Sequence, residues 1–302
     1  ATANMILLAG ARPVFVDIDR DTLNLRVEEV EQAVTERTRA VMPVHFAGLC
    51  CEAEALQQVC AQHGLALIED AAHALGASCP QGQAGLLGLA GCFSFHPSKP
   101  ITTGEGGALV TRDEELAEKA RLLRFHGVTR GARARMSGTA EYEVQALGFK
   151  YNMLDLQAAI GIHQLRRAED LRSRREALAR SYAELLGDLD GELLFLPPDA
   201  PEGWRHAWHL YVIKLNLDRL KITRAEFRAL LRERQVGTGL HYLSLHLQPY
   251  YQRELGCRPE DFPEASWASE RVVSLPLFAD MTDEDVVYVV EKVREVLESN
   301  VR

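Results

Sequence analysis

Short apolar runs alternate with segments whose apolar residues recur every three or four positions. Runs of the first kind predict strands, and they occupy residues 13–18, 39–46, 65–70, 91–96 and 107–111. The segments 26–36 and 52–64 predict helices, the second ending at a glycine. Strands and helices in alternation, with short buried strands, indicate an α/β fold with a largely parallel central sheet.

The second half of the chain has a different pattern of predicted elements. Residues 154–186 predict one long helix, because the helical pattern has almost no breaker. Beyond it we expect strands at 208–216 and 236–242, a helix at 223–235 and a closing helix after Thr282, a common capping residue. We therefore divide the chain into a large domain, residues 1–165, and a smaller C-terminal α/β domain, residues 166–302.

Composition narrows the class of protein. The chain of 302 residues has a net charge of -9 and no strongly basic stretch, so a nucleic-acid or anionic-membrane partner is not expected. No apolar run approaches the ~20 residues that span a bilayer. The six cysteines form no CxxC pair and no metal-ligand spacing, which favours reduced thiols, no metal site and a cytoplasmic protein.

One lysine stands in an unusual setting. Lys99 lies between two prolines in the stretch FSFHPSKPITTGEGG, directly after a predicted strand and before a glycine-rich turn. A lysine that is desolvated among small residues loses part of its preference for the charged form and can act as a nucleophile. Schiff bases with carbonyl cofactors require such an amine. An exposed loop lysine remains the alternative.

Acidic and imidazole groups stand at the ends of two predicted strands. Asp70 ends the run LALIED, His73 follows it, and His45 lies near the end of an earlier strand. Catalytic groups in parallel sheets gather at the carboxyl ends of strands. Pyridoxal phosphate needs an acidic partner for its ring nitrogen, which Asp70 could supply. A plain helix cap is the alternative for Asp70.

Two other motifs predict no metal site. Asp17, Asp19, Asp21 and Glu28 have EF-hand-like offsets, but the position that requires glycine holds Thr22. The motif WRHAWHLYV contains two histidines but no third ligand, so aromatic packing at an interface is the better interpretation.

Several long motifs together resemble one known family. The chain is similar to the DegT/DnrJ/EryC1/StrS aminotransferases in IEDAAHALGA, FSFHPSKPITTGEGGALVT, FHG, KYNMLDLQAAIG, HAWHLYVIKL, GTGLHY and SLPLFADMTDEDV. This resemblance implies a fold-type I transferase that uses pyridoxal 5'-phosphate. Details such as GFKYN and SLPLF most resemble the members that make UDP-4-amino-4-deoxy-L-arabinose, which implies transfer from glutamate to C4 of a nucleotide-linked keto sugar in lipopolysaccharide or polysaccharide biosynthesis.

The resemblance also implies roles for residues around the cofactor. Lys99 would bind the cofactor covalently and then act as the catalytic acid and base. Asp70 would pair with the ring nitrogen, and His73 would approach the ring or its 3-hydroxyl. Ser94 would bind the phosphate.

Further residues are implied for the partner subunit and the substrate. Asn152 would reach the phosphate in the neighbouring subunit, so that a homodimer shares its active sites. His241 and His246 would approach the nucleotide sugar, and glutamate and 2-oxoglutarate would be the amino donor and its product.

Three implications concern the limits of this prediction. The resemblance places an aromatic ring and further phosphate donors before Ala1, so we expect this chain to lack the N-terminal part of the large domain. An inactive or regulatory truncated homologue is therefore one alternative. A sugar dehydratase with the same cofactor is another, but those relatives carry histidine in place of the lysine, and this chain has Lys99.

Overall fold

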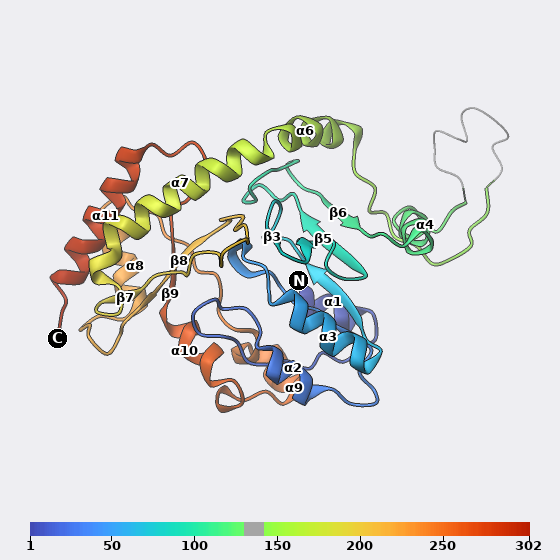
Figure 1. Cartoon of the computed structure of the whole chain (residues 1–302), viewed down its shortest axis with the longest axis horizontal. Coiled ribbons are helices and arrows are strands. Elements are labelled where there is room, and N and C mark those ends of the chain that lie inside the picture. Colours follow the sequence, from blue (N-terminus) through green and yellow to red (C-terminus); the bar gives the residue numbers. More distant parts are fainter. Residues whose placement is uncertain (130–141) are drawn as a thin grey trace.

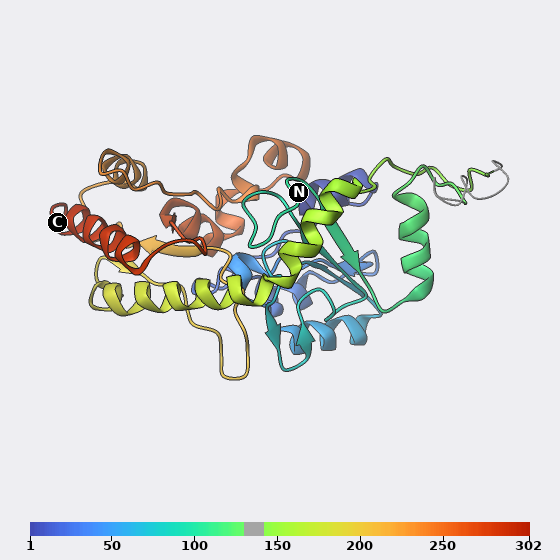
Figure 2. The same cartoon turned by 90° about the horizontal axis from the view of Figure 1, so that it is seen from above.

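The computed structural model describes residues 1–129 and 142–302. Figure 1 shows two lobes joined along one side by a pair of consecutive helices, and Figure 2 shows the same helices running from one lobe to the other. The first lobe is built on a sheet with the strand order β1-β2-β5-β6. Its strands are β1 (Ala40–Val41), β2 (Ala66–Asp70), β5 (Ala90–Ser94) and β6 (Gly107–Val110).

The first lobe confirms the predicted parallel arrangement. β1 and β5 both pair with β2 in parallel, and only β6 runs antiparallel to its neighbour. The helices of this lobe are α1 (Thr2–Leu8), α2 (Val27–Ala33), α3 (Ala53–His63) and α4 (Glu114–Leu123), and a small hairpin is made by β3 (Ser78–Cys79) and β4 (Gly82–Gln83). Because β2 and β5 are parallel, their carboxyl ends meet at one edge.

One predicted strand does not form, and another is shorter than its apolar run. Residues 13–18 form no strand in the described structure and contribute a single bridge, Ile18 to Leu25. The reason is a long-range contact: the carboxylate of Asp17 accepts bonds from the main chain of Glu264 and Ala265, at 2.9 and 2.8 Å, which diverts this segment towards the second lobe. After Val41 the run continues beside β2 only as an isolated bridge, because Pro43 has no N–H to donate.

The predicted helix at 154–186 is two helices. α6 (Asp155–Arg166) and α7 (Ala168–Leu186) are separated at Arg167, whose dihedral angles are φ -97° and ψ -2°. Only α7 has buried residues, whereas α6 has none. The break therefore separates a helix that packs in the second lobe from one that lies on the surface of the first.

The second lobe is a three-stranded antiparallel sheet with helices around it. Its strands are β7 (Leu194–Phe195), β8 (Tyr211–Leu215) and β9 (Val272–Leu275), and its helices are α8 (Arg224–Glu233), α9 (Pro249–Leu255), α10 (Pro263–Arg271) and α11 (Asp283–Glu298). Thr282 caps α11 as predicted, in a capping box with Asp285. The predicted strand at 236–242 is wrong, because only Gly239 bridges to Ser274 there.

Separate apolar clusters fill the two lobes. The largest combines one face of α7 with α8, α11 and the second sheet, including Leu178, Tyr211, Phe227 and Val293. Smaller clusters lie around β2 and α3 and around the β3–β4 hairpin. Within the described parts of the chain, four short 3-10 segments occupy Phe46–Gly48, Gly187–Leu189, Leu245–Leu247 and Pro259–Asp261. Among the described helices, none combines the length and apolar character needed to cross a membrane.

Candidate active site

Asp70 ends β2 at the edge where the parallel strands finish. Its Oδ1 accepts the N–H of Ala72 at 3.0 Å, and its Oδ2 accepts the hydroxyl of Thr2. A turn follows instead of a helix, so the interpretation of Asp70 as a helix cap is wrong. The neighbouring strand β5 pairs Cys92 with Asp70, and Lys99 follows this strand after a short loop.

Lys99 is half-buried, and its environment changes the chemistry of its amine. Burial lowers its pKa, and the nearby carboxylate of Asp70 opposes that shift only in part. Among the described residues, the amine Nζ has no hydrogen-bond partner, although the backbone N–H of Lys99 donates to His96 at 2.9 Å. The amine of Lys99 is therefore without a hydrogen-bond partner in the described structure, and more of it is uncharged than in an exposed lysine.

His73 is buried next to these two groups, with 5% of its surface exposed. Burial, with a smaller contribution from the positive charge of Lys99, lowers its pKa to about 3, and Asp70 opposes the shift only in part. Its Nε2 lies 3.3 Å from the hydroxyl of Tyr242, and its ring centroid lies 4.4 Å from that of His209. Its Nδ1 is buried and has no partner among the described residues.

His241 is brought to the same place from the second lobe. Its Nδ1 lies 2.8 Å from the hydroxyl of Ser274 on β9, and Gly239 leaves room for its ring. A Cβ at Gly239 would lie 2.5 Å from Cε1 of His241. Burial lowers the pKa of His241, as do the charges of Lys99 and Arg228.

A cavity of about 160 Å³ opens beside these residues. It is lined by both lobes, through Ser98 from the first and His209, His241, Tyr242 and Ser274 from the second, together with several backbone segments. The rings of His209 and His241 and the hydroxyl groups of Ser98, Tyr242 and Ser274 line this space, and His209 and Tyr242 in turn lie against His73.

Ser94 and Asn152, two further predicted site residues, form no hydrogen bond with Lys99 in the described structure. Ser94 ends β5, and its Oγ accepts the N–H of His96 at 3.3 Å. Asn152 precedes α6 and accepts a hydrogen bond from Lys150. Their predicted phosphate contacts stay predictions.

His246 is held elsewhere. Its Nε2 lies 2.8 Å from the hydroxyl of Ser266, and its ring packs against Phe262 at 4.9 Å. Burial lowers its pKa, and Asp17 and Asp261 oppose this. The structure therefore places His246 in the packing around α10 and does not bring it to the cavity, so its assignment to the sugar nucleotide stays an untested prediction.

His45, expected at the same sheet edge, turns into the core instead. Its Nε2 lies 2.9 Å from Oε2 of Glu69, while its Nδ1 accepts the N–H of Cys51. The carboxylate of Glu69 also accepts the backbone N–H groups of Gly85, Leu87 and Gly88, at 2.6 to 2.8 Å. This pair fixes the loop before β5 and thereby the edge that carries Asp70.

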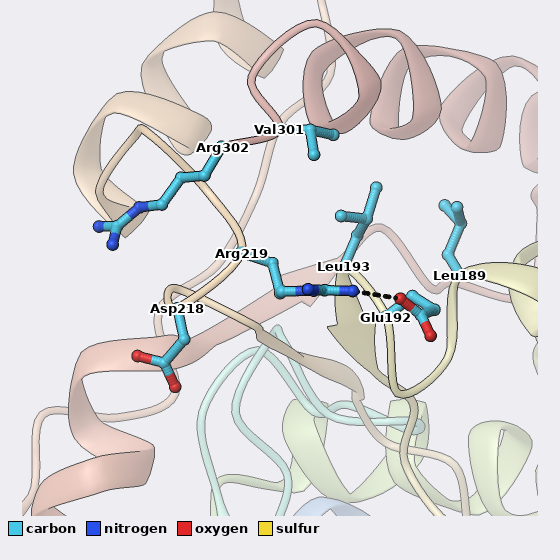
Figure 3. A pocket seen from close by; sticks show the side chains of 7 residues that line it. All are labelled: Leu189, Glu192, Leu193, Asp218, Arg219, Val301 and Arg302. Carbon is cyan, nitrogen blue, oxygen red and sulfur yellow. Dashed lines mark hydrogen bonds and ion pairs between the residues drawn. The ribbon is translucent and has the colours of Figure 1, made fainter.

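A larger cavity, about 410 Å³, lies far from this group, near Arg302. Figure 3 shows the ion pair between Arg219 and Glu192 across it, beside apolar side chains such as Leu193. Both charged groups are exposed. Among the described residues, no group of three or more histidine, cysteine, aspartate or glutamate side chains is placed to hold a metal ion.

Comparison with known proteins identifies the family to which the chain belongs. Residues 1–294 match the DegT/DnrJ/EryC1/StrS aminotransferase family. The chain belongs to this family. It is 45% identical over 300 residues to the spore coat polysaccharide biosynthesis protein SpsC of Bacillus subtilis, covering 98% of this chain and 76% of that protein.

Solved structures agree over almost the whole chain. Helicobacter pylori PseC, an aminotransferase involved in the biosynthesis of pseudoaminic acid, superposes with a TM-score of 0.91 at 32% identity, over 99% of this chain and 77% of PseC. The PLP form of Spr1654 from Streptococcus pneumoniae, described as a sugar aminotransferase, gives 0.89 at 29% identity, over 98% of this chain and 78% of that one. The predicted family and fold-type I class are confirmed.

The chain is therefore an aminotransferase of a family that uses pyridoxal 5'-phosphate. The described residues fit this cofactor: Lys99 offers an unpartnered amine, Asp70 a carboxylate and His73 a buried ring nitrogen that lacks a partner. Two neighbours of His73 escaped prediction. Tyr242 was visible only as part of GTGLHY, and His209 only as part of an aromatic motif that we interpreted as packing.

Proposed function

We propose that this aminotransferase moves the amino group of glutamate to the keto carbon of a nucleotide-linked sugar, with C4 as the position aminated. The observation that supports it most is the free amine of Lys99, half-buried beside Asp70 and His73. C4 is chosen because GFKYN and SLPLF resemble the enzymes of UDP-4-amino-4-deoxy-L-arabinose synthesis.

The roles of the cofactor-side residues follow from their chemistry. When bound, pyridoxal phosphate supplies an electron sink for the substrate carbon. Lys99 would hold the cofactor, and its Nζ would move a proton between the reacting carbons as general base and acid. Asp70 would face the ring nitrogen, where a carboxylate favours the protonated form by charge. His73, kept uncharged by burial, supplies a directed hydrogen bond.

The substrate side is assigned from the cavity wall. A sugar presents several hydroxyl groups, and sites that select it need donors and acceptors at fixed positions. Ser98, Ser274, Tyr242 and His241 provide such groups around the cavity. The bond from Ser274 to Nδ1 fixes the ring of His241 and leaves its Nε2 for the substrate. SpsC and PseC are named for polysaccharide and pseudoaminic acid biosynthesis, which favours an activated sugar.

We also propose that the active protein is a homodimer that docks through α6 and the segment before it. Large apolar side chains are exposed there: Leu147 at 95%, Tyr151 at 72%, Leu154 at 62%, Leu156 at 73%, Ile162 at 55% and Leu165 at 58%. A concentration of exposed apolar side chains in one segment is typical of an interface, and a second copy is the common solution.

Contacts between α6 and the loop after Lys99 link this surface to the site. Gln157 donates to the carbonyl of Glu105 at 2.9 Å, and the side chain of Gln164 accepts the N–H of Thr102. A copy docked on α6 would lie close to the catalytic loop. Asn152, at the start of α6, is the residue we assign to the partner's phosphate site.

An isotope experiment tests the proposed reaction. The purified protein would be incubated with pyridoxal phosphate, glutamate labelled with ¹⁵N and a UDP-4-keto sugar, and the product examined by mass spectrometry and NMR. We expect label on C4 of the sugar and 2-oxoglutarate in equal amount, and no product with Lys99→Ala. Label on another carbon would contradict the C4 assignment, and absence of any reaction with glutamate would contradict glutamate as the amino donor.

A further inference from the structure

His209 touches His73 but has no assigned role. It lies in the loop before β8, with 5% of its surface exposed. The two rings are 4.4 Å apart between centroids and inclined by 57°. The ring of Tyr242 lies 6.2 Å from His73, and its hydroxyl reaches Nε2. Rings from two separate segments of the second lobe thus restrict how His73 can turn.

His209 and His73 differ from the other buried histidines of the described structure in the hydrogen bonding of their ring nitrogens. His45 bonds through both nitrogens, and His206 and His246 bond through one each, to the N–H of Trp208 and to Ser266. His73 and His209 each keep a buried Nδ1 without a partner in the described structure. Buried polar atoms are normally satisfied, so two exceptions on adjacent rings, one of which lines the cavity, indicate a functional requirement.

The backbone that carries His209 is held in an uncommon conformation. Trp208 has φ +47° and Ala47 has φ +55°, although neither residue is glycine. The two segments bond to each other: His209 donates to Ala47 at 2.9 Å, and Ala207 donates to Gly48 at 2.9 Å. Left-handed residues of this kind cost free energy and persist where the surrounding structure enforces them, often at functional sites.

A buried arginine anchors the same loop. Arg175 on α7 is 6% exposed, and its Nη1 donates to the carbonyls of Trp208, His209 and Leu277, at 3.3, 3.3 and 2.8 Å. Burial lowers its pKa to about 10, and no carboxylate pairs with it among the described residues. A buried cation of this kind is costly, and here all three contacts fix the loop and the end of β9 beside the cavity.

We propose that His209 is a positioning residue: its ring, anchored through the loop by Arg175, fixes the orientation of His73 towards the cofactor. The inference rests on the proposed role of His73. It assigns His209 a function through His73 and not through contact with the reacting atoms. Packing is the property that acts, so a planar side chain of similar size should replace the imidazole.

The test compares His209→Ala with His209→Gln. We expect His209→Ala to bind pyridoxal phosphate and to react with glutamate about ten to a hundred times less well, since small misplacements cost factors of this size, and His209→Gln to recover most of the loss. Cofactor affinity would be measured by fluorescence titration and the glutamate half-reaction by absorbance. Neither readout needs the sugar. Circular dichroism would confirm that both variants fold.

A second readout uses the protein without cofactor. Spectra of ¹³C-labelled histidine, assigned with His73→Gln, report the pH at which His73 titrates. Because burial lowers the pKa of His73 to about 3, removing the neighbouring ring in His209→Ala should raise that midpoint towards the ordinary histidine value. His209→Gln should leave it close to that of the wild type.

His206→Ala is the matched control, because His206 is buried in the same loop and stacks on Trp208 instead of on His73. Equal losses in His206→Ala and His209→Ala would overturn the proposal, since any loosening of the loop would then suffice. Wild-type affinity and midpoint in His209→Ala would overturn it too. A wild-type protein that fails to bind pyridoxal phosphate would instead contradict the proposed function.

Discussion

Lys99 and Asp70 are coupled electrostatically across the edge of the parallel sheet. Burial lowers the pKa of the lysine, and the carboxylate counteracts this. Asp70 comes at the end of β2, and Lys99 follows the neighbouring strand β5, which pairs with β2 at Cys92. The sheet therefore brings together two groups that are far apart along the chain. A substitution of Asp70 should consequently change the reactivity of Lys99.

The first prediction concerns the reactivity of Lys99 in the protein without cofactor. At about two pH units below the usual lysine pKa of about 10.4, an amine-selective reagent should label Lys99 faster than Lys119, an exposed lysine on α4. Asp70→Asn should accelerate the labelling, because the carboxylate raises the pKa of Lys99. Peptide mapping measures both rates, and equal labelling of the two lysines would contradict the prediction.

The second prediction concerns Asp70 in the reaction. Asp70→Asn keeps the acceptor for the N–H of Ala72, so the turn should persist while turnover falls about a hundredfold or more, as for the loss of one directed electrostatic group in an active site. Asp113→Asn, at the cap of α4, is the matched control and should retain full turnover. Near wild-type rates in Asp70→Asn would remove this residue from the cofactor site.

The third prediction concerns the room that Gly239 gives His241. A Cβ in Gly239→Ala would lie 2.5 Å from the imidazole, so the ring must leave Ser274, and the KM for the sugar nucleotide should rise about tenfold, the loss of one directed hydrogen bond. Gly237→Ala meets nothing within 4 Å and serves as the control. Cofactor affinity should remain unchanged in both variants, and an unchanged KM in Gly239→Ala would exclude His241 from the substrate site.

The fourth prediction concerns pH and the buried pair of Glu69 and His45. Burial alone would raise the pKa of Glu69, but the bonds from His45, Gly85 and Gly88 outweigh it and lower the pKa below 4.5. The stabilisation is therefore present above pH 4.5, the unfolded value, and is lost as the pH falls through the lower folded value.

Glu69→Gln tests this pair by urea unfolding at several pH values. The variant should lose about 3 kcal/mol or more of unfolding free energy at neutral pH, because it breaks a buried pair, and its stability should depend less on pH in the acid range. Glu118→Gln on the exposed face of α4 should behave like the wild type. An identical acid dependence of Glu69→Gln and wild type would contradict the linkage.

The fifth prediction concerns the proposed homodimer. Leu156→Glu places a charge on the apolar surface of α6 and should yield a monomer by light scattering, because a charge buried at an interface is costly. Val287→Glu, a similarly apolar exposed position on α11, should leave assembly unchanged. A dimer that survives Leu156→Glu would require a different interface.

Periodicity and capping residues in the sequence correctly predicted the helices and strands that depend mainly on their own residues. The helices α2, α3, α8 and α11 and the strands β2, β5, β6 and β8 follow from periodicity and caps, and the motifs around Lys99 identified the family and the cofactor. Residues 13–18 and 236–242 have equally good strand patterns but contribute only the isolated bridges Ile18–Leu25 and Gly239–Ser274, because contacts such as those of Asp17 with α10 direct the chain elsewhere.

The sequence by itself determined which chemistry the protein carries, because the ordered motifs around Lys99, Asp70 and His73 identify the amine, the carboxylate and the imidazole of the cofactor site. Only the tertiary structure decided which other groups act with them. His241 and His209 come from the second lobe, and their place beside His73 depends on the break at Arg167, the clamp of Arg175 and the left-handed turns at Ala47 and Trp208. His45 and His246 look equally suitable in sequence, yet the structure pairs His45 with Glu69 in the core and holds His246 beside Ser266, so the substrate role of His246 stays a prediction. Proximity between distant segments is set by packing of the whole chain, which no local pattern encodes.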